Sequence, residues 1–303
     1  MHILITGGAG FIGSHSVDAL RAAGHSVRVF DDLSTGHVDN LVGKSVDFVQ
    51  GDLRDAAAVR RAVDGVDAVL HLAALVSVPL SMRAPLETFA INTTGTTHVL
   101  EAARLSPRMP RVVLASTSAV YGDLPGRKDE LSPIAPLSPY GASKLMAEQA
   151  LSVYSRSYGL PVVRLRYFNV YGPRQRADSP YSGVLAKWTA AARAGQECLV
   201  FGDGEQTRDF VHVRDVARAN LAALTAPLPE PDPLFVVATG ESVTLNQVLA
   251  ALGRAAGASL PVRHDQPRAG DIVHSSADAA RLRRAFGWAP QVVLQDGLRE
   301  LLD

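Results

Sequence analysis

The segment that decides the fold runs from Ile3 to Gly13 and reads ILITGGAGFIG. Its first residues are apolar or β-branched, as in a buried strand, and the glycines that follow are spaced as Gly-x-x-Gly-x-x-Gly at Gly7, Gly10 and Gly13. Such glycines permit a tight turn, a close approach of the backbone to a pyrophosphate at a helix N-terminus, and close packing of that helix on the strand. The order of strand, glycine loop and helix therefore predicts a dinucleotide-binding unit.

Two acidic residues, Asp31 and Asp32, end the second apolar run, 18 and 19 residues beyond Gly13. A carboxylate at this place can accept hydrogen bonds from the 2′-hydroxyl of a ribose, and its charge repels a 2′-phosphate. We therefore predict that the cofactor is NAD rather than NADP. A glycine-rich turn followed by a solvated acidic loop is the purely structural alternative.

Two further loops follow apolar runs where a cofactor would pass. Asp52 and Leu53 come after the third run and could contact an adenine, while Ala73 and Ala74 come after the fourth and offer small side chains. Either pair, taken singly, is equally typical of an ordinary loop.

Short apolar runs alternate with longer segments of helical spacing over the first part of the chain. Most of the runs are nearly continuous in apolar residues, as expected when helices cover both faces of a parallel sheet. The sequence therefore predicts an α/β fold with a doubly wound parallel sheet. Strands are expected at Ile3–Thr6, Ser26–Phe30, Val46–Val49, Ala68–Leu72, Val112–Ala115 and Val162–Arg166, and helices at Asp18–Ala23, Ala56–Val63 and Glu87–Leu105.

The pattern changes after Gly172-Pro173, where loops interrupt shorter helices. We predict a smaller α+β lobe there, so that residues 1–172 form the cofactor domain, rejoined by part of 210–238, and residues 173–303 form the second lobe. The helices of this part are expected at Val184–Ala194, Val213–Leu224, Leu245–Ala256 and Asp278–Phe286.

Composition excludes several classes of protein. The 303 residues carry 30 basic and 30 acidic side chains, so no broad basic face for nucleic acid is expected. No apolar run approaches the roughly 18 residues of a membrane helix, and the opening residues resemble a strand rather than a signal peptide. The single Cys198 cannot form an internal disulfide or a thiolate zinc site, which favours the cytoplasm.

Tyr140 and Lys144 lie four residues apart, hence on one face of a helix that begins near Pro139. A tyrosine is a poor base at its reference pKa of about 10, but a neighbouring cation favours the phenolate. The hydroxyls of Ser116 and Thr117 end the fifth strand, at the edge of the sheet where ligands bind. This grouping predicts a tyrosine base assisted by a hydroxyl; a surface Tyr-Lys pair and strand-end capping are the structural alternatives.

Together these segments resemble the extended short-chain dehydrogenase/reductase family, and within it the nucleotide-sugar 4-epimerases of the UDP-galactose 4-epimerase type. The resemblance covers nearly the whole chain and implies a Rossmann-like sheet, NAD as cofactor, and a UDP-sugar substrate held by the second lobe. The segments that carry it are the glycine loop, Asp31 to Gly36, Gly51 to Leu53, Ser116 to Gly122, Tyr140 to Lys144, Arg166 to Pro173 and Gly202 to Phe210.

The resemblance assigns roles to single positions. Tyr140 matches the base, Thr117 the hydroxyl that assists it, and Lys144 the lysine that binds ribose and lowers the tyrosine pKa. The residues implied at the cofactor are Gly7, Gly10, Phe11, Ile12, Gly13, Asp31, Asp32, Ser34, Thr35, Gly36, Asp52, Leu53, Leu72, Ala73, Ala74, Asn92, Tyr140, Lys144 and Tyr167.

The same resemblance implies a substrate site. Asn169 and Arg208 match contacts to the diphosphate, Arg208 because its planar fork binds phosphate oxygens in pairs. Arg268 and Asp271 match residues near a phosphate and the uridine ribose, although Ala269 replaces the more usual proline between them. The implied substrate residues are Ser77, Thr117, Ser118, Asn169, Phe201, Arg208, Arg268, Asp271 and Ser275, with Phe201 stacking on uracil.

The reaction implied is inversion at C4 of the sugar. Tyr140, assisted by Thr117, removes the 4-hydroxyl proton as hydride passes to NAD⁺, and the resulting 4-keto sugar turns and takes hydride on its other face. A 4,6-dehydratase is the main rival, but dehydratases of this family place an Asp-Glu pair after the catalytic threonine, where this chain has Ser118 and Ala119. Another oxidoreductase of the family and a non-enzymatic NAD-binding scaffold are further alternatives.

The choice of sugar is expected to depend on Ser275. A large aromatic residue at this place restricts family members to unmodified hexoses, and a small one leaves room for a 2-acetamido group. Ser275, together with Ser77 to Ser81 and the segment that begins at Asn92, resembles the subgroup acting on UDP-GlcNAc and UDP-GalNAc. We therefore expect these substrates to be accepted, either alongside UDP-Glc and UDP-Gal or in preference to them.

The resemblance further implies a homodimer, in which helices Asn92–Leu105 and Tyr140–Tyr158 pair with their copies in a four-helix bundle. His71 and His212 occur in apolar strands and are interpreted as hydrogen-bonded core histidines. No pair of histidines has metal-ligand spacing, so no metal is predicted.

Overall fold

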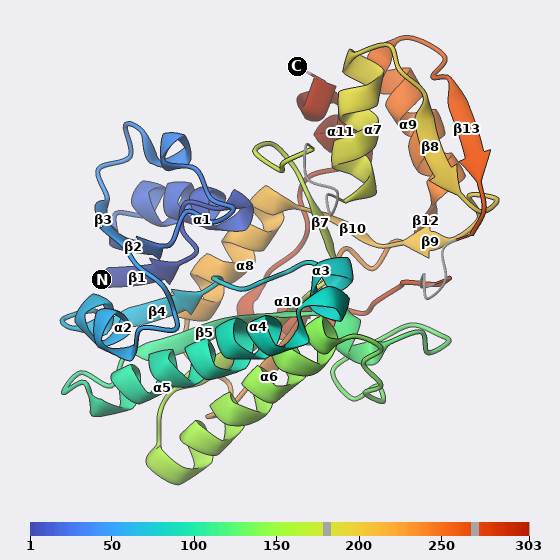
Figure 1. The fold of residues 1–303 in the computed structure, drawn as a ribbon. Coiled ribbons are helices and arrows are strands. Elements are labelled where there is room, and N and C mark those ends of the chain that lie inside the picture. The colour runs from blue at the N-terminus through green and yellow to red at the C-terminus, as the bar shows by residue number, and fades with distance from the viewer. Residues whose placement is uncertain (178–182, 268–272, 303) are drawn as a thin grey trace.

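Seven strands of the described residues form one parallel sheet. The computed structural model describes residues 1–177, 183–267 and 273–302. The strand order is β11-β6-β5-β4-β1-β2-β3, so the winding reverses between β1 and β4 (Figure 1). Ligands bind at the carboxyl edge beside such a reversal. The strands are β1 (His2–Thr6), β2 (Ser26–Asp31), β3 (Asp47–Gln50), β4 (Ala68–His71), β5 (Arg111–Thr117), β6 (Val162–Tyr167) and β11 (Leu234–Val237).

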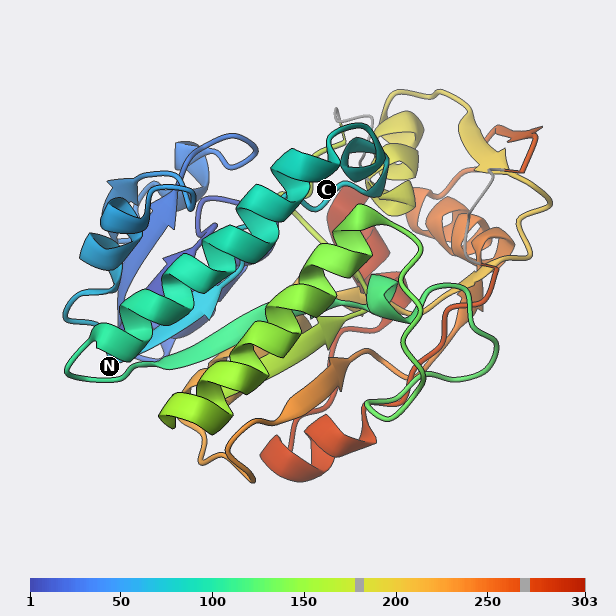
Figure 2. The ribbon, with the colours of Figure 1, turned by 60° about the horizontal axis from the view of Figure 1, so that its bottom comes forward.

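Helices cover both faces of the sheet. One face is packed by α1 (Phe11–Ala22), α8 (Val213–Thr225) and α10 (Ala280–Phe286), and the other by α2 (Ala56–Val63), α5 (Gly95–Leu105) and α6 (Pro139–Tyr158). Figure 2 shows α5 and α6 side by side across their face. Each face has its own apolar core, because central strands such as β1 and β4 direct alternate side chains to opposite sides. The predicted Rossmann-like α/β fold is confirmed.

Two helices differ from the sequence expectation. Helix α1 begins at Phe11, seven residues before the predicted Asp18, because its buried first turns contain small and polar residues that give no apolar periodicity. The segment predicted as one helix at Glu87–Leu105 is α4 (Pro85–Phe89), a π-helical turn (Ala90–Thr94) and α5. The short helix α3 (Val78–Arg83) precedes it.

A smaller group of elements has a separate core. Strand β8 (Cys198–Phe201) pairs in parallel with β13 (Val262–Asp265), and α7 (Val184–Arg193), α9 (Leu245–Ala256) and α11 (Leu294–Leu302) pack around the buried Trp188. Two further strand pairs connect this group to the sheet. They are β7 (Asn169–Tyr171) with β10 (Phe210–His212), and β9 (Thr207–Arg208) with β12 (Val243–Thr244).

The chain passes between the two groups of elements more than once. After β10 it returns to the sheet as α8 and β11, and after β13 it returns again as α10. Leu282 of α10 is buried in the same core as α1 and α8. The helices expected at Val213–Leu224 and Asp278–Phe286 therefore pack on the sheet, and the predicted division at residue 172 remains a prediction.

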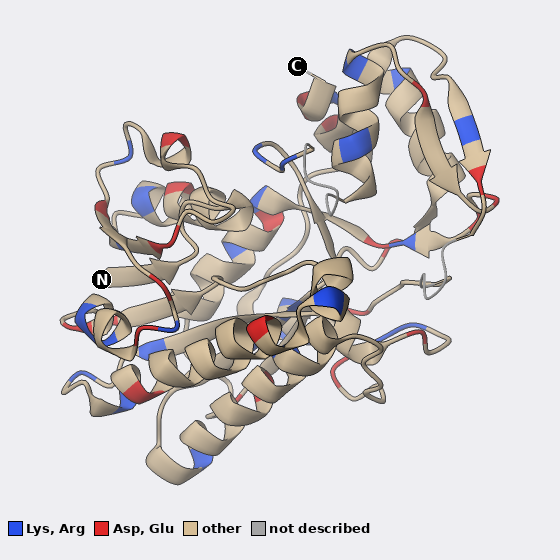
Figure 3. Cartoon of the chain, viewed as in Figure 1, with Lys and Arg blue, Asp and Glu red and all other residues tan. Residues whose placement is uncertain are grey.

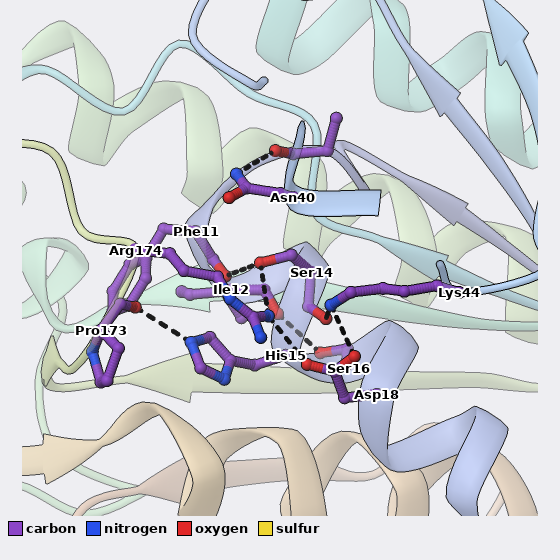
Figure 4. Close-up of polar contacts among 11 residues, drawn as sticks. Phe11, Ile12, Ser14, His15, Ser16, Asp18, Asn40, Lys44, Pro173 and Arg174 are labelled. Carbon is purple, nitrogen blue, oxygen red and sulfur yellow. Dashed lines mark hydrogen bonds and ion pairs between the residues drawn. The ribbon is translucent and has the colours of Figure 1, made fainter. Parts of the chain in front are cut away.

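Polar contacts fasten α1 to the first residues after β7 (Figure 4). The His15 imidazole Nε2 lies 2.9 Å from the carbonyl oxygen of Pro173, and Arg174 donates to a carboxylate oxygen of Asp18 at 2.8 Å. Lys44 donates to the other oxygen of Asp18 at 2.5 Å. Burial lowers the pKa of His15 to about 4, so the ring is neutral at physiological pH. The contacts of His15 and Asp18 with Pro173 and Arg174 thus fix the residues after β7 against α1.

Basic and acidic residues are interspersed over both parts of the molecule (Figure 3). Within the described residues, the search for a helix of sufficient length and apolar character to span a membrane finds none. Among the same residues, no three His, Cys, Asp or Glu side chains are grouped so that they could hold a metal ion.

Candidate active site

The glycine loop between β1 and α1 packs so closely that side chains are excluded from it. Gly7 has a φ of +72°, and a Cβ atom there would lie 2.7 Å from the backbone nitrogen of Ala73. A Cβ atom on Gly13 would lie 2.1 Å from the carbonyl oxygen of Gly7. Gly10 precedes α1 at its N-cap and has no side chain to cover the first helical N–H groups, which include those of Phe11 and Ile12. The loop therefore fits a pyrophosphate at the start of α1.

Asp31, at the end of β2, faces this loop. Its two carboxylate oxygens accept hydrogen bonds from the backbone N–H groups of Ala9 at 3.0 Å and Leu33 at 2.8 Å. Burial raises the pKa of Asp31, and the two backbone hydrogen bonds oppose that rise. Each carboxylate oxygen has two lone pairs, so Asp31 can still accept a ribose hydroxyl.

The turn after Asp31 is built by its own side chains. Asp32 accepts hydrogen bonds from the backbone N–H of Ser34 at 2.9 Å and from its hydroxyl at 2.6 Å. Thr35 and Gly36 follow, and a Cβ atom on Gly36 would lie 2.9 Å from the carbonyl carbon of Ala9. The predicted cofactor residues of this turn thus lie against the glycine loop.

The other predicted cofactor loops have structural partners as well. Asp52 binds the Arg54 guanidinium, which lowers the pKa of Asp52, and Leu53 is buried beneath Gly95. The backbone N–H groups of Leu72 and Ala73 donate to the carbonyl and hydroxyl oxygens of Thr6, and Ala74 follows at the same edge of the sheet.

The predicted catalytic residues come from β5 and α6. Thr117 is the last residue of β5, and its hydroxyl accepts a hydrogen bond from the N–H of Ala119 at 3.1 Å. Ser138 caps α6, which carries Tyr140 in its first turn and Lys144 one turn later. The hydroxyl of Thr117 acts on the phenol of Tyr140 and lowers its pKa. The structure therefore brings together the hydroxyl and the phenol.

Burial affects the two ionisable groups in opposite directions. It raises the pKa of Tyr140, while the hydrogen bond with Thr117 lowers it. Lys144 is 2% exposed, and its burial lowers the pKa to about 8, against the opposing effect of the Glu148 carboxylate. Deprotonation of Tyr140 consequently depends on positive charge close to its oxygen.

Asn92 holds the site together from the π-helical turn. Its side chain accepts from the N–H of Leu75 at 2.8 Å, and donates to the carbonyl of Leu75 at 3.0 Å and to the hydroxyl of Ser143 at 2.9 Å. It thus links the loop after β4 to α6, between Tyr140 and Lys144.

His71 is a hydrogen-bonded core histidine, as expected. Its ring nitrogens lie 2.7 Å from the hydroxyl of Thr6 and 2.9 Å from that of Thr96, and burial lowers its pKa to about 3. His212 is also buried, and its Nδ1 accepts from the backbone N–H of Arg214.

Tyr167, a predicted cofactor residue, is the last residue of β6. Its hydroxyl donates to Asn220 on α8 at 2.6 Å, inside the core, and burial raises its pKa. The contact of Tyr167 with the cofactor remains a prediction.

The predicted substrate residues flank the elements that join the two groups. Asn169 donates its side-chain N–H to the carbonyl of Asp209 at 3.0 Å, and Arg208 lies on the neighbouring β9. Ser77 caps α3, Ser118 begins a short 3₁₀ helix, and the buried Ser275 donates its N–H to the carbonyl of Thr207. Arg268 and Asp271 lie outside the described residues.

A cleft of about 810 Å³ opens beside Phe201 at the end of β8. It is walled on one side by the loop that follows Phe201 and on the other by the end of β13 and the residues beyond it. The lining residues are Phe201, Gly202, Asp203, Glu205, Gln206, His264, Asp265, Gln266, Pro267, Val273 and His274.

Sequence reasoning missed a buried ion pair beside the catalytic helix. Glu148 of α6 accepts two hydrogen bonds from the Arg166 guanidinium of β6, at 2.9 and 2.7 Å. The side chains are 0% and 4% exposed. The signal was available, because Glu148 follows Lys144 by four residues and so continues the face that begins at Tyr140.

Comparison with known proteins places the chain in a family. Residues 3–238 match the model of the NAD dependent epimerase/dehydratase family. A putative UDP-glucose 4-epimerase of Methanocaldococcus jannaschii is 37% identical, with 99% of this chain and 97% of the relative covered. A dTDP-glucose 4,6-dehydratase of Streptomyces niveus is 35% identical, with 100% and 92% covered.

Solved structures agree with this placement, and two are similar over nearly their whole length. A UDP-N-acetylglucosamine 4-epimerase from Methanobrevibacter ruminantium, in complex with UDP-N-acetylmuramic acid, has a TM-score of 0.94 at 36% identity, covering 99% of this chain and 96% of that one. A UDP-glucose 4-epimerase from Thermus thermophilus, in complex with NAD, has a TM-score of 0.91 at 40% identity, covering 100% and 98%. The chain belongs to the NAD dependent epimerase/dehydratase family, and its cofactor is NAD.

Proposed function

We propose that the chain is an NAD-dependent UDP-sugar 4-epimerase, an isomerase whose base is Tyr140. The observation that carries the proposal is the placement of Thr117 at the carboxyl end of β5 and of Tyr140 in the first turn of α6, with Lys144 on the same helix face. The Thr117 hydroxyl lowers the pKa of the Tyr140 phenol, which supports the pairing. Epimerase relatives that match over nearly the whole chain support it.

Tyr140 would accept the proton of the sugar 4-hydroxyl and later return it, with Thr117 passing the proton between them. Lys144 favours the phenolate by its charge. Bound NAD⁺ supplies a hydride acceptor and donor at the sugar carbon, and it adds positive charge beside the phenol. Asp31 and the glycine loop would hold its ribose and pyrophosphate.

Binding remote from the reacting carbon leaves that carbon free to turn. Asn169 and Arg208 are proposed to hold the diphosphate, and the cleft beside Phe201 would take the nucleotide. The sugar is then anchored through its diphosphate, so that either face of C4 can be presented to the cofactor.

Elimination of water, the dehydratase reaction, is the second candidate because one relative bears that name. It requires an acid and a base near C5 and C6. The residues that follow Thr117 are Ser118 and Ala119, which begin a short 3₁₀ helix and carry no group that titrates near neutral pH. Epimerisation is therefore preferred.

We further propose that UDP-GlcNAc and UDP-GalNAc are accepted. Ser275 is small and buried, and its backbone is fixed by a hydrogen bond to Thr207, so the space beside it is not filled by a larger side chain. The neighbour from Methanobrevibacter ruminantium, named as a UDP-N-acetylglucosamine 4-epimerase, supports this choice.

A homodimer is proposed from the exposed apolar residues on the helical face. Met146 and Val153 of α6 are 51% and 55% exposed, and Met82 and Leu86 of the neighbouring α3 and α4 are 60% and 84% exposed. Apolar surface gathered on adjacent helices is typical of an interface with a second copy.

The test is to incubate the purified protein with UDP-Glc and, separately, with UDP-GlcNAc, and to identify the sugar products. Appearance of the C4 epimer without net reduction of NAD supports the proposal. A 4-keto-6-deoxy product would establish the dehydratase instead, and recovery of unchanged sugar from protein containing NAD would contradict both.

A further inference from the structure

A charged pair, Glu148 of α6 and Arg166 of β6, is buried between the helix and the sheet. The Arg166 guanidinium donates from Nε to Glu148 Oε1 at 2.9 Å and from Nη2 to Oε2 at 2.7 Å. The hydroxyl of Ser116 donates to the same Oε1. Burying two charges carries a desolvation cost that their attraction often fails to recover, so stability alone is a weak explanation for the pair.

The pair is aligned with the proposed reaction site. Tyr140, Lys144 and Glu148 occupy every fourth position of α6 and share one helix face. On the facing strands, Ser116 directly precedes Thr117 and is in register with Arg166. Every residue that holds Glu148 is therefore next to, or in register with, the strand end that supplies the catalytic hydroxyl.

Several charged or titratable groups face this region. From β4, His71 is neutral, since burial and the charge of Lys144 both lower its pKa. From β6, Arg164 and Arg166 approach Glu148. Beyond them, the hydroxyl of Tyr121 accepts from Arg166 Nη1 at 3.0 Å.

Glu148 supplies the negative charge that acts on Lys144. Burial lowers the pKa of Lys144, and the Glu148 carboxylate raises it. The carboxylate cannot turn away, because Arg166 and Ser116 hold its oxygens from two strands.

We propose that Glu148 is a positioning residue of the reaction: its carboxylate, fixed by Arg166 and Ser116, keeps the ammonium of Lys144 charged and on the face shared with Tyr140. This inference rests on the proposed function, because it concerns the base assigned there. It adds a residue that touches neither sugar nor cofactor.

The test is the pH dependence of kcat in Glu148→Gln and in the double variant Glu148→Gln/Arg166→Met. Turnover needs charged Lys144 and falls as that group loses its proton. Without the carboxylate, the alkaline limb of the profile should move to lower pH by about one unit. The double variant removes both members of the Glu148–Arg166 pair, so Arg166 is not left as an unpaired buried charge, and the variant can be tested if the single variant fails to fold.

Two controls separate charge from structure. Ser116→Ala removes a contact to Glu148 without changing charge. Asp232→Asn breaks another largely buried pair, with Arg164, which lies two residues before Arg166 on β6 and whose Nη2 lies 3.0 Å from Asp232 Oδ1. Both should lower the thermal unfolding temperature. Asp232→Asn should leave the alkaline limb in place, and Ser116→Ala should move it much less than Glu148→Gln does, because the carboxylate keeps its charge and its two bonds to Arg166.

A second readout does not need turnover. Lys144 is one of four lysines, so its Cε resonance in carbon-labelled protein can be assigned with Lys144→Met and followed through a pH titration. The titration should move to lower pH in the double variant. If the folded variants leave both the alkaline limb of kcat and the Lys144 titration unmoved, the role of Glu148 is wrong and the proposed function stands. If the wild-type protein turns over no UDP-sugar, the proposed function is wrong, and the Lys144 titration alone then decides the role of Glu148.

Discussion

The hydroxyl of Thr117, the last residue of β5, acts on the phenol of Tyr140 in the first turn of α6 and lowers its pKa. The end of a strand and the start of a helix thus bring a hydroxyl and a phenol together. Because the neighbouring β4 and β1 mark the reversal of the sheet, this pair lies at the edge where the glycine loop also opens.

Replacement of the proposed base should stop turnover and preserve the fold. Tyr140→Phe removes the ionisable oxygen and no carbon atom, so we expect kcat to fall by at least about 10²-fold. Bound NAD, measured after denaturation, should remain near the wild-type content. Turnover at the wild-type rate would remove Tyr140 from the mechanism.

Two substitutions test whether the hydroxyl of Thr117 takes part in the reaction. Thr117→Ser keeps the hydroxyl that bonds Tyr140, and Thr117→Ala loses it, so only the alanine variant should lose about 10-fold or more in kcat. Equal activity of the two variants would assign Thr117 to strand-end capping through Ala119 instead.

Turnover and stability should respond oppositely to alkaline pH. Burial lowers the pKa of Lys144 to about 8, from the ordinary lysine value of 10.5. Its charged form favours the phenolate, so kcat should decline as pH rises through 8. Because the unfolded chain binds the proton more tightly, this group's contribution to the free energy of unfolding should rise between these two pH values. The checks are a pH-rate profile and denaturant unfolding in Lys144→Met against wild type; a flat profile would contradict the assignment.

Alanine variants of two glycines with positive φ can separate the effect of backbone strain from the effect of close packing in the cofactor loop. Gly7 and Gly24 have φ of +72° and +82°, so alanine at either should cost about 1 kcal/mol of stability. Only at Gly7 would the new Cβ meet backbone, 2.7 Å from the nitrogen of Ala73, whereas Gly24 has no atom within 4 Å. Gly7→Ala should therefore also lose bound NAD, and Gly24→Ala should retain it. Retention by both variants would show that the loop does not need this close packing.

The parts of the fold that follow from the sequence are those with local signals. Glycine spacing and apolar runs place β1, β2 and the cofactor loop correctly, because each depends on neighbouring residues. The packing of α10 on the sheet was not predictable, since contacts between Leu282 and the distant α8 leave no local pattern. The same holds for the contact between Arg166 and Glu148. Helical spacing places Glu148 on the face of Lys144, but only the packing of α6 on β6 brings Arg166 to it.

The site residues also divide into those with a local sequence signal and those whose position depends on packing. Thr117, Tyr140 and Lys144 could be predicted because they lie in two short segments at a strand end and a helix start. Tyr167 was assigned by resemblance, and its hydroxyl donates to Asn220 on α8, a helix more than 40 residues further along the chain. A side chain's direction depends on what packs beside it, which periodicity does not report.

The choice of sugar is expected to turn on the volume at position 275. Ser275 is 8% exposed, its N–H bonds the carbonyl of Thr207, and its own carbonyl accepts from the hydroxyl of Ser242. Its backbone is therefore fixed, and a larger side chain must extend into the space beside it. Ser275→Tyr should lower kcat/KM for UDP-GlcNAc by about 10-fold or more, the discrimination that steric exclusion gives. It should change kcat/KM for UDP-Glc much less.

Ser242→Ala serves as the control, because it removes the contact to the Ser275 carbonyl without adding volume. It should leave the ratio of kcat/KM for the two substrates unchanged. Equal loss of both substrates in Ser275→Tyr would show that position 275 supports the fold and does not select the sugar.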